Sequence, residues 1–393
     1  MTRIATKPAS PATETMRVRA PIVALGILAL LAALWGALLR LGWNLPVVNS
    51  SLPSAHGPLM VSGFLGTLIS MERAVALRAR WAYSAPLLSA LGALVLMSGV
   101  SPVAGAFLIV LGSLGMVAIF SAIVRRQPAL FTYTMALGAV AWFIGNAIWL
   151  TGLPIFRLVQ WWAAFLILTI VGERLELSRL MRLSRTTEML YLFAIVLFTF
   201  GLVVDSIAGI FFPAAGSAVG LQITGVGMVA LALWLLRYDI ARRTVRQTGL
   251  TRFIAWCLLL GYVWLGIGGA LRVVSPYVSV TNMYDAMLHT IFLGFVMSMI
   301  FGHAPIILPA VLGRPMRYHR SFYAHWILLH LSLAVRIAAD LGAGRAAFAA
   351  WQWAGVFNVI AVLLFLFATA RAIRSASASK RATRTFWKRS TSA

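Results

Sequence analysis

Long apolar segments alternate with short polar ones from near residue 20 to near residue 372. Each apolar run has about 18–24 residues, enough for a helix to cross the hydrocarbon core of a bilayer. Dividing the runs at charged residues and at Pro and Gly breaks predicts twelve transmembrane helices. We expect these spans near residues 21–41, 56–77, 84–100, 103–124, 130–151, 156–173, 189–207, 215–236, 251–273, 283–302, 322–340 and 348–372. The predicted fold class is therefore all-α, a polytopic membrane protein.

The segments outside the spans are polar and divide the chain into three parts. Residues 1–19 predict a flexible N-terminal segment, residues 20–372 the twelve-helix transmembrane domain, and residues 373–393 a basic C-terminal tail. Neither tail has an apolar face to bury, so both suit a position on anionic lipid. The first apolar run is too long for the core of a cleavable signal peptide and is interpreted as the first span. No segment has the composition of a soluble domain.

The positions of the charged residues indicate that the chain contacts a membrane and not nucleic acid. It is 61% hydrophobic and 11% charged, with a formal net charge of +24. A charge this high could suit nucleic acid, but the basic residues lie in short loops, mainly those after even-numbered spans. Examples after spans 2, 4, 6, 8, 10 and 12 are Arg73, Arg125, Arg174, Arg237, Arg314 and Arg371. The positive-inside rule therefore predicts cytoplasmic termini, contact with membrane lipid and no nucleic-acid partner.

Every fourth predicted span ends with an ionisable residue. Span 2 ends with TLISMERAVAL, span 6 with LTIVGERLELS and span 10 with MSMIFGHAPII, which aligns Glu72, Glu173 and His303. This recurrence predicts three pseudo-repeats of four helices, with spans 2, 6 and 10 facing one another. It also predicts that the three side chains lie close together, with Arg73 or Arg174 able to neutralise a carboxylate. The alternative is that these residues only mark where each helix leaves the bilayer.

Two histidines lie within apolar spans on the predicted outer side. His56 opens span 2, and His289 lies about two turns, roughly 9 Å, into span 10. Ionisable side chains inside a span face the bundle interior and mark a site, and two histidines at similar depth could clamp one haem iron. Met60 shares the helix face of His56, and Asp285 could accept the second N–H of His289. The alternative is an interfacial His56 and a His289 that only forms an interhelical hydrogen bond.

Small residues and the single cysteine indicate which kinds of cofactor the chain could hold. Gly57, Gly63 and Gly66 thin one side of span 2, and Gly294 does the same below His289, which leaves room for a flat macrocycle or a neighbouring helix. Cys257 is the only cysteine, which excludes internal disulfides, Cys-ligated clusters and covalent haem attachment through two thioethers. Any metal here must use His, Met or carboxylate ligands.

The stretch HGPLM, from His56 to Met60, resembles the HGxxM pattern at the outer start of helix 2 in the catalytic subunit of haem-copper oxidases. In that family the histidine binds the low-spin haem, and the second ligand lies on helix 10, where this chain has His289. Three arcs of four helices are also the architecture of that family. The resemblance implies a haem held by His56 and His289, which we expect to be b-type. His330, the third histidine within an apolar span, is the next candidate ligand.

The chain departs from the oxidase pattern at the copper site. Helix 10 of the oxidases carries His-x-His, whereas the first of these positions is Met287 here, and spans 6 and 7 contain no histidine. Oxygen reduction is therefore not expected. A closer resemblance is to NnrS-type proteins, twelve-helix bacterial membrane proteins of haem and copper linked to nitric oxide stress, through the stretch from Leu288 to His303. It implies a bacterial inner-membrane protein for electron transfer or nitric oxide response, with a redox partner protein.

A second group of candidate ligands lies toward the predicted cytoplasmic side. His303 ends span 10, residues 303–313 suggest a Pro-broken re-entrant loop, and His325 follows within YHRSFYAHWILLH. With Glu72 and Glu173, these histidines would give mixed nitrogen and oxygen ligands for copper or another divalent metal. The alternative is an aromatic belt, in which histidines accompany Tyr and Trp at the membrane interface.

Two functions of different classes follow from these features. The first is a haem-binding membrane protein for electron transfer or nitric oxide response, without oxygen-reducing activity. The second is a secondary transporter in which Glu72, Glu173 or Asp205 exchanges protons or binds substrate. Transporters usually pair two six-helix halves, so three groups of four helices favour the haem protein. The sequence contains no Gly-rich phosphate loop before a helix and no nucleophile elbow.

Overall fold

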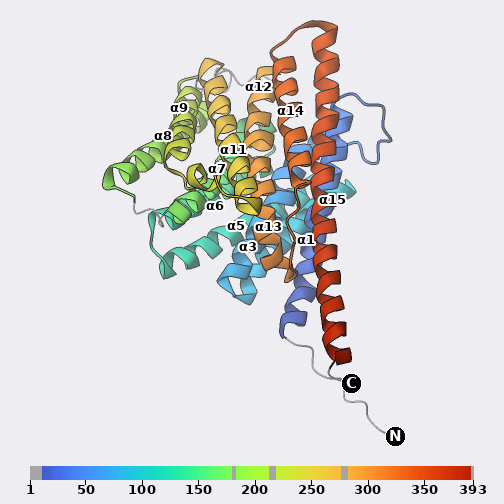
Figure 1. The fold of residues 1–393 in the computed structure, drawn as a ribbon. Helices are drawn as coiled ribbons and strands as arrows, with labels where there is room; N and C mark the ends of the chain where they lie inside the picture. The colour runs from blue at the N-terminus through green and yellow to red at the C-terminus, as the bar shows by residue number, and fades with distance from the viewer. Residues whose placement is uncertain (1–10, 179–182, 212–217, 276–281, 391–393) are drawn as a thin grey trace.

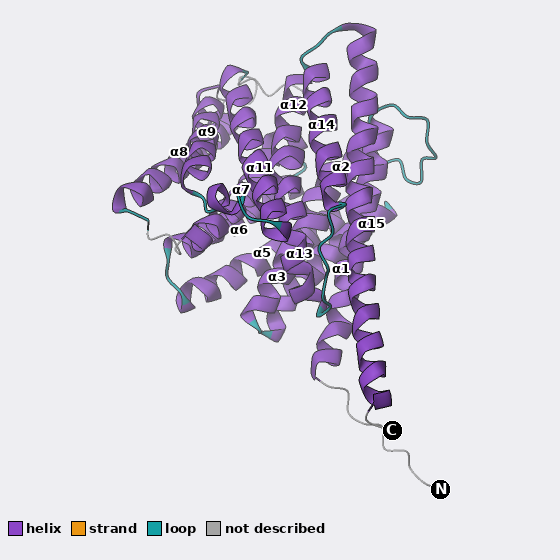
Figure 2. Cartoon of the chain, in the orientation of Figure 1, coloured by secondary structure: helices purple, strands orange, loops and turns teal. Residues whose placement is uncertain are grey.

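The computed structural model describes residues 11–178, 183–211, 218–275 and 282–390. Within these residues every regular secondary-structure element is a helix, and loops join the helices (Figure 2). The described part contains 12 helices long and apolar enough to cross a membrane, which confirms the predicted all-α membrane fold. The predicted start of span 8, at residue 215, lies outside the described residues.

The spans follow one another along the chain with few additional elements. The first six are α1 (Pro11–Arg40), α2 with η1 and α3 (Leu52–Pro58, Leu59–Gly66 and Thr67–Leu77), η2 with α4 (Arg80–Tyr83 and Ser84–Ser98), α5 (Pro102–Arg126), α6 (Leu130–Leu150) and α7 (Ile155–Ser178). The last six are α8 (Arg185–Phe211), α9 (Ala218–Tyr238), α11 (Gly249–Val274), α12 with η4 and α13 (Asn282–His289, Thr290–Met297 and Ser298–Leu312), α14 (Phe322–Asp340) and α15 (Gly344–Ser390). The short α10 (Ala241–Thr244) lies between α9 and α11. Helix α1 begins and α15 ends at the same end of the bundle, which we call the terminal end (Figure 1).

Spans 2, 6 and 10 form the centre of the bundle, as the repeat predicted. In their most apolar windows, 61% of span 2, 78% of span 6 and 61% of span 10 are buried, and no other span exceeds 56%. The helix α13 of span 10 contacts α3 of span 2, and η4 of span 10 contacts α7 of span 6. Consecutive helices pack side by side around this centre, including α4 on α5, α8 on α9 and α14 on α15. The period of four in burial therefore matches the period of four in the helix-end motifs.

Two of the central spans contain π-helices that the sequence did not predict. Span 2 is π-helical over η1, and span 10 is π-helical over η4. Glu72 lies thirteen residues after the start of η1 at Leu59, and His303 lies thirteen residues after the start of η4 at Thr290. Because π-helical turns are rare and occur often at functional sites, their shared position marks spans 2 and 10 as related.

The predicted re-entrant loop after His303 is wrong, because the chain remains helical to Leu312. Helix α13 continues through Pro305 and Pro309, and it ends where Gly313 takes a left-handed conformation with φ of 63°. Each proline removes one backbone hydrogen bond, and membrane helices tolerate this loss where neighbouring groups and local adjustment compensate. Span 10 is therefore the 31-residue segment Asn282–Leu312.

The terminal helices extend into both predicted tails. Helix α1 begins at Pro11 within the predicted N-terminal segment, and α15 continues to Ser390 within the predicted C-terminal tail. The alanines in the last part of α15 favour this continuation, since Ala has the highest helix propensity. Residues 1–10 and 391–393 of the two tails lie outside the described residues.

Candidate functional site

His56 and His289 lie within electrostatic range of each other at the end of the bundle away from the termini. The Nδ1 atom of His56 is 2.8 Å from the backbone oxygen of Ala33 on α1, and Nδ1 of His289 is 2.8 Å from the backbone oxygen of Asp285. When each Nδ1 donates to its carbonyl, the lone pair of Nε2 is available to a metal. Met60, in η1, is partly buried against the apolar core.

Asp285 orients His289 from one turn earlier in α12. Its Oδ1 lies 3.3 Å from Nδ1 of His289, within ion-pair distance, and the hydrogen bond of that nitrogen goes to the backbone oxygen of Asp285. Its Oδ2 accepts hydrogen bonds from Nε and Nη2 of Arg336 on α14 at 3.0 and 2.7 Å. Trp351 on α15 donates to the same oxygen at 3.3 Å. One carboxylate thus fixes the histidine and joins spans 10, 11 and 12.

The glycines near the two histidines mainly serve helix packing. A Cβ atom added at three of them would clash with neighbours: Gly63 with Ala93, Gly66 with Trp142, and Gly294 with Trp264. At Gly57 the nearest atom, from Trp162, would be 4.0 Å from the added Cβ. Of the two uses that the sequence allowed, close helix packing therefore applies to three glycines, and Trp162 lies at van der Waals distance from a Cβ added at the fourth.

A cavity of about 370 Å³ lies among the central spans toward the terminal end. Residues of spans 1, 2, 6, 10 and 12 line it, and nearly all are apolar. The polar exceptions are Glu72, Thr169, Glu173, His303 and Thr369. The sequence prediction that Glu72, Glu173 and His303 lie close together therefore agrees with the geometry, since all three face one cavity.

Arg73 is the charged partner of both glutamates in this cavity. Its Nη2 donates to Oε1 of Glu173 and lies 3.5 Å from Oε1 of Glu72. Arg174 takes no part in these two ion pairs, because Asp239 engages its guanidinium from the segment between α9 and α10. Nε and Nη2 of Arg174 donate to the two Asp239 oxygens at 2.8 and 3.0 Å, and both side chains are buried. The expected neutralisation of a carboxylate thus comes from Arg73.

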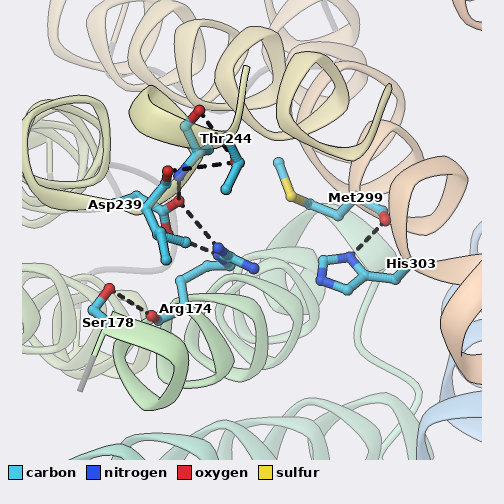
Figure 3. A network of polar contacts seen from close by, with 8 residues as sticks. Arg174, Ser178, Asp239, Thr244, Met299 and His303 are labelled. Atoms are coloured by element: carbon cyan, nitrogen blue, oxygen red, sulfur yellow. Dashed lines mark hydrogen bonds and ion pairs between the residues drawn. The ribbon is translucent and has the colours of Figure 1, made fainter. Parts of the chain in front are cut away.

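The His303 imidazole completes the polar part of the cavity. Its Nδ1 is 2.8 Å from the backbone oxygen of Met299, and the ring lies within electrostatic range of Glu72 and Arg174. Figure 3 shows the His303 ring bonded to Met299, with the guanidinium of Arg174 turned toward Asp239 instead. With its Nδ1 proton donated to Met299, His303 presents an acceptor at Nε2.

The other two candidate histidines are not part of either site. His325 is 2% exposed and does not line the cavity. Its ring is surrounded by the aromatic rings of Phe253, Phe301, Phe322 and Phe365. This helix-end position faces the apolar core because of the rotation of α14, which span boundaries do not specify.

His330 is a fully bonded contact in the bundle core. Trp264 donates to its Nδ1 at 2.9 Å, so the ring proton resides on Nε2, which is 3.1 Å from Oγ of Ser298. Ser298 in turn donates to the backbone oxygen of Cys257 at 2.7 Å. Both ring nitrogens are used, so the geometry does not offer His330 as a substitute ligand.

The cavity does not have the ligand arrangement expected for copper or another divalent metal. Within the described residues, no three His, Cys, Asp or Glu side chains are grouped so that they could hold a metal ion. Arg73 pairs with both glutamates, as a metal ion shared between them would, and His325 is not among the residues that line the cavity. The geometry of the described residues therefore does not support the expected mixed His and Glu metal site.

Two buried arginines were missed by the sequence reasoning. Arg174 was treated as a helix-end charge, yet it forms a buried ion pair with Asp239. Arg272 on α11 is 2% exposed, donates to Gln160 on α7, and lies 3.2 Å from the sulfur of Met287. The signal for Arg272 was present, because an arginine inside an apolar span is rare and faces the protein interior.

Comparison with known proteins gives a family without an assigned activity. Residues 19–374 match the family model described as Domain of unknown function (DUF8744). No curated protein matches the chain. The match covers the whole of the twelve-span region.

Proposed function

We propose that this chain, which belongs to the DUF8744 family, is a membrane protein that binds haem between His56 and His289 and transfers electrons. The observation that supports it is the pair of neighbouring imidazoles on central spans 2 and 10, each with Nδ1 at a backbone carbonyl. Such anchoring is the usual arrangement of a metal-ligating histidine. Haem bound there would supply one-electron redox chemistry.

The surroundings of the histidine pair fit this group in charge. Haem carries two carboxylates, and Arg40, which acts electrostatically on His56, could pair with one of them, whereas Arg336 is bound to Asp285. Asp285 keeps the His289 ring in place through its backbone oxygen and its carboxylate. The resemblance to NnrS-type proteins supports nitric oxide stress as the setting, with a redox partner protein as the source or acceptor of electrons.

The arginine distribution supports an orientation with the terminal end in the cytoplasm of a bacterial inner membrane. Arginines follow spans 2, 4 and 6, which all end on the same side as the two termini. Lys and Arg in short loops remain on the cytoplasmic side during insertion. The His56 and His289 pair would then lie near the outer surface, and the cavity near the cytoplasm.

An optical spectrum tests the haem proposal directly. The detergent-purified protein, produced with a supply of haem, should show a low-spin bis-histidine spectrum that changes on reduction. His56→Ala and His289→Ala should each abolish it, whereas His319→Ala should not, because the His319 side chain is exposed and its ring hydrogen-bonds to Ser321. A protein without haem absorbance, or an unchanged spectrum in both ligand variants, would refute the proposal.

A second candidate function is secondary transport, favoured by the cavity at the terminal end. It lies between the central spans, and transporter substrates bind at such positions. Glu72 and Glu173 line it, whereas Asp205 lies on α8 within electrostatic range of Arg272, at the other end. Proton uptake into vesicles containing the protein, driven by a substrate gradient and lost in Glu72→Gln, would distinguish transport from electron transfer.

A further inference from the structure

The cavity at the terminal end has an apolar body and one polar wall. Apolar residues from α1, α13 and α15 close it on the sides away from α7. The two glutamates and His303 lie together at the polar wall. Their side chains keep limited exposure, 26% for Glu72 and 19% for Glu173, in a site otherwise lined by hydrocarbon. An apolar cavity with a few convergent polar groups is the usual form of a small-molecule site.

The charges at the polar wall do not balance. The two cavity carboxylates, Glu72 and Glu173, share the single guanidinium of Arg73. Glu173 holds it by a direct hydrogen bond, and Glu72 is the more distant partner at 3.5 Å. Arg174 does not correct the imbalance, because Asp239 binds it through two hydrogen bonds. A buried carboxylate without a full partner is unfavourable unless it is protonated or meets a cation.

The remaining polar atoms of the cavity also favour a positively charged group. His303 presents Nε2 as an acceptor, since its Nδ1 is at the backbone oxygen of Met299. Thr169 donates its own hydroxyl proton to the backbone oxygen of Phe165, which leaves only acceptor capacity. Thr369 on α15 is 8% exposed, and its Oγ1 has no hydrogen-bond partner. An unbonded hydroxyl in such a place indicates a missing ligand group or water.

We propose that this cavity binds a lipophilic organic monocation, with its apolar body among the central spans and its cationic head at Glu72. In the absence of the cation, a proton on the carboxyl group of Glu72 balances the charge. Binding releases this proton to water, so one positive charge replaces another and no bond other than O–H is broken. The site is independent of haem at the opposite end, because it shares no residue with the His56 and His289 pair.

Several ionisable groups act electrostatically at this wall. Those on the central spans are Glu72 and Arg73 of α3, Glu173, Arg174 and Glu176 of α7, and His303 of α13. Arg174 in turn interacts with Asp239, which lies between α9 and α10, and with Tyr262 of α11. Glu72 is the group to test among them, because it lines the cavity and is not hydrogen-bonded to Arg73.

Tetraphenylphosphonium is a suitable probe, since it is a permanent cation with an apolar surface. Its binding to the purified full-length protein can be followed by calorimetry, with triphenylphosphine oxide as a neutral aromatic control. We expect saturable binding of the cation, at least about tenfold weaker binding of the neutral compound, and affinity that rises with pH as protons compete less. In weakly buffered solution, binding should release protons, up to one for each cation.

Variants separate the roles of charge and space. Glu72→Gln should weaken cation binding about tenfold or more and abolish proton release. Glu188→Gln is the matched control, because it makes the same change on the exposed first turn of α8, and it should bind as the unmodified protein does. Ala304→Leu, which fills the cavity and keeps every charge, should also prevent binding. Equal affinity for the neutral compound, or unchanged binding and proton release in Glu72→Gln, would overturn the proposal.

Discussion

The buried ion pair between Arg174 and Asp239 should contribute strongly to stability, because neither charge has access to water. Their closest atoms are 2.8 Å apart, and the side chains are 3% and 0% exposed. At an effective dielectric constant of about 20, this separation corresponds to roughly 6 kcal/mol of attraction. Desolvation offsets much of that, so the net value of the pair is small, but removing one partner leaves a buried charge and costs about 3–5 kcal/mol.

Asp239→Asn tests the charge alone. The Asp239 Oδ1 also accepts a hydrogen bond from the backbone N–H of Ala241 at 2.7 Å, and an asparagine oxygen can keep this bond. We expect Asp239→Asn to lower the free energy of unfolding by about 3–5 kcal/mol, and Arg174→Met to lower it by a similar amount. The double variant should lose less than the sum of the two, because it leaves no unpaired charge.

Reversible unfolding in mixed detergent, followed by tryptophan fluorescence, gives the free energies for this comparison. Glu188→Gln serves as the control and should change stability by less than about 0.5 kcal/mol, as exposed substitutions usually do. Losses below about 1 kcal/mol for either single variant, or losses that simply add in the double variant, would show that the pair is accessible to water and that the reasoning fails.

Two further predictions concern packing and orientation. Gly66→Ala should destabilise the protein by about 1–3 kcal/mol in the same unfolding assay, since its Cβ would clash with Trp142. Gly57→Ala should be nearly neutral, and equal losses in the two variants would contradict the close contact between Gly66 and Trp142. A membrane-impermeant maleimide should label Gln127→Cys only in inverted vesicles, and Val48→Cys only in intact cells with a permeable outer layer. Cys257 is buried and should give no background labelling. The reverse labelling pattern would invert the proposed orientation.

The approximate length of most spans was predictable because the bilayer sets it. The eleventh span was expected at residues 322–340 and is observed as Phe322–Asp340. The error in span 10 came from treating Pro305 and Pro309 as ends of the helix, which holds in water but not inside a packed membrane bundle. The π-helices had no shared sequence signal, since Pro58 precedes η1 but no proline precedes η4 within α12.

The depth of each site residue was predictable, but its direction around the helix axis was not. Glu72, Glu173 and His303 were grouped correctly because three aligned helix ends fix a common depth. The same reasoning placed His325 with them, although rotation of α14 turns it into the aromatic core. Asp239 was overlooked because it lies in a polar connection that has the composition of an ordinary loop.

The π-helices explain how spans 2 and 10 can serve both ends of the bundle. Each π-helix begins thirteen residues before the ionisable residue at the end of its span. In span 6, the residue thirteen positions before Glu173 is Gln160. There α7 remains a regular helix, and Gln160 accepts a hydrogen bond from Arg272.

A π-helix changes the rotation between the residues before and after it, so the two ends of one span can face different partners. Span 2 thereby presents His56 at one end and Glu72 at the other, and span 10 presents His289 and His303 in the same way. The uninterrupted α7 supplies Glu173 to the cavity and no histidine to the opposite end. A histidine pair therefore arises from two of the three repeats, whereas the cavity draws an ionisable residue from all three.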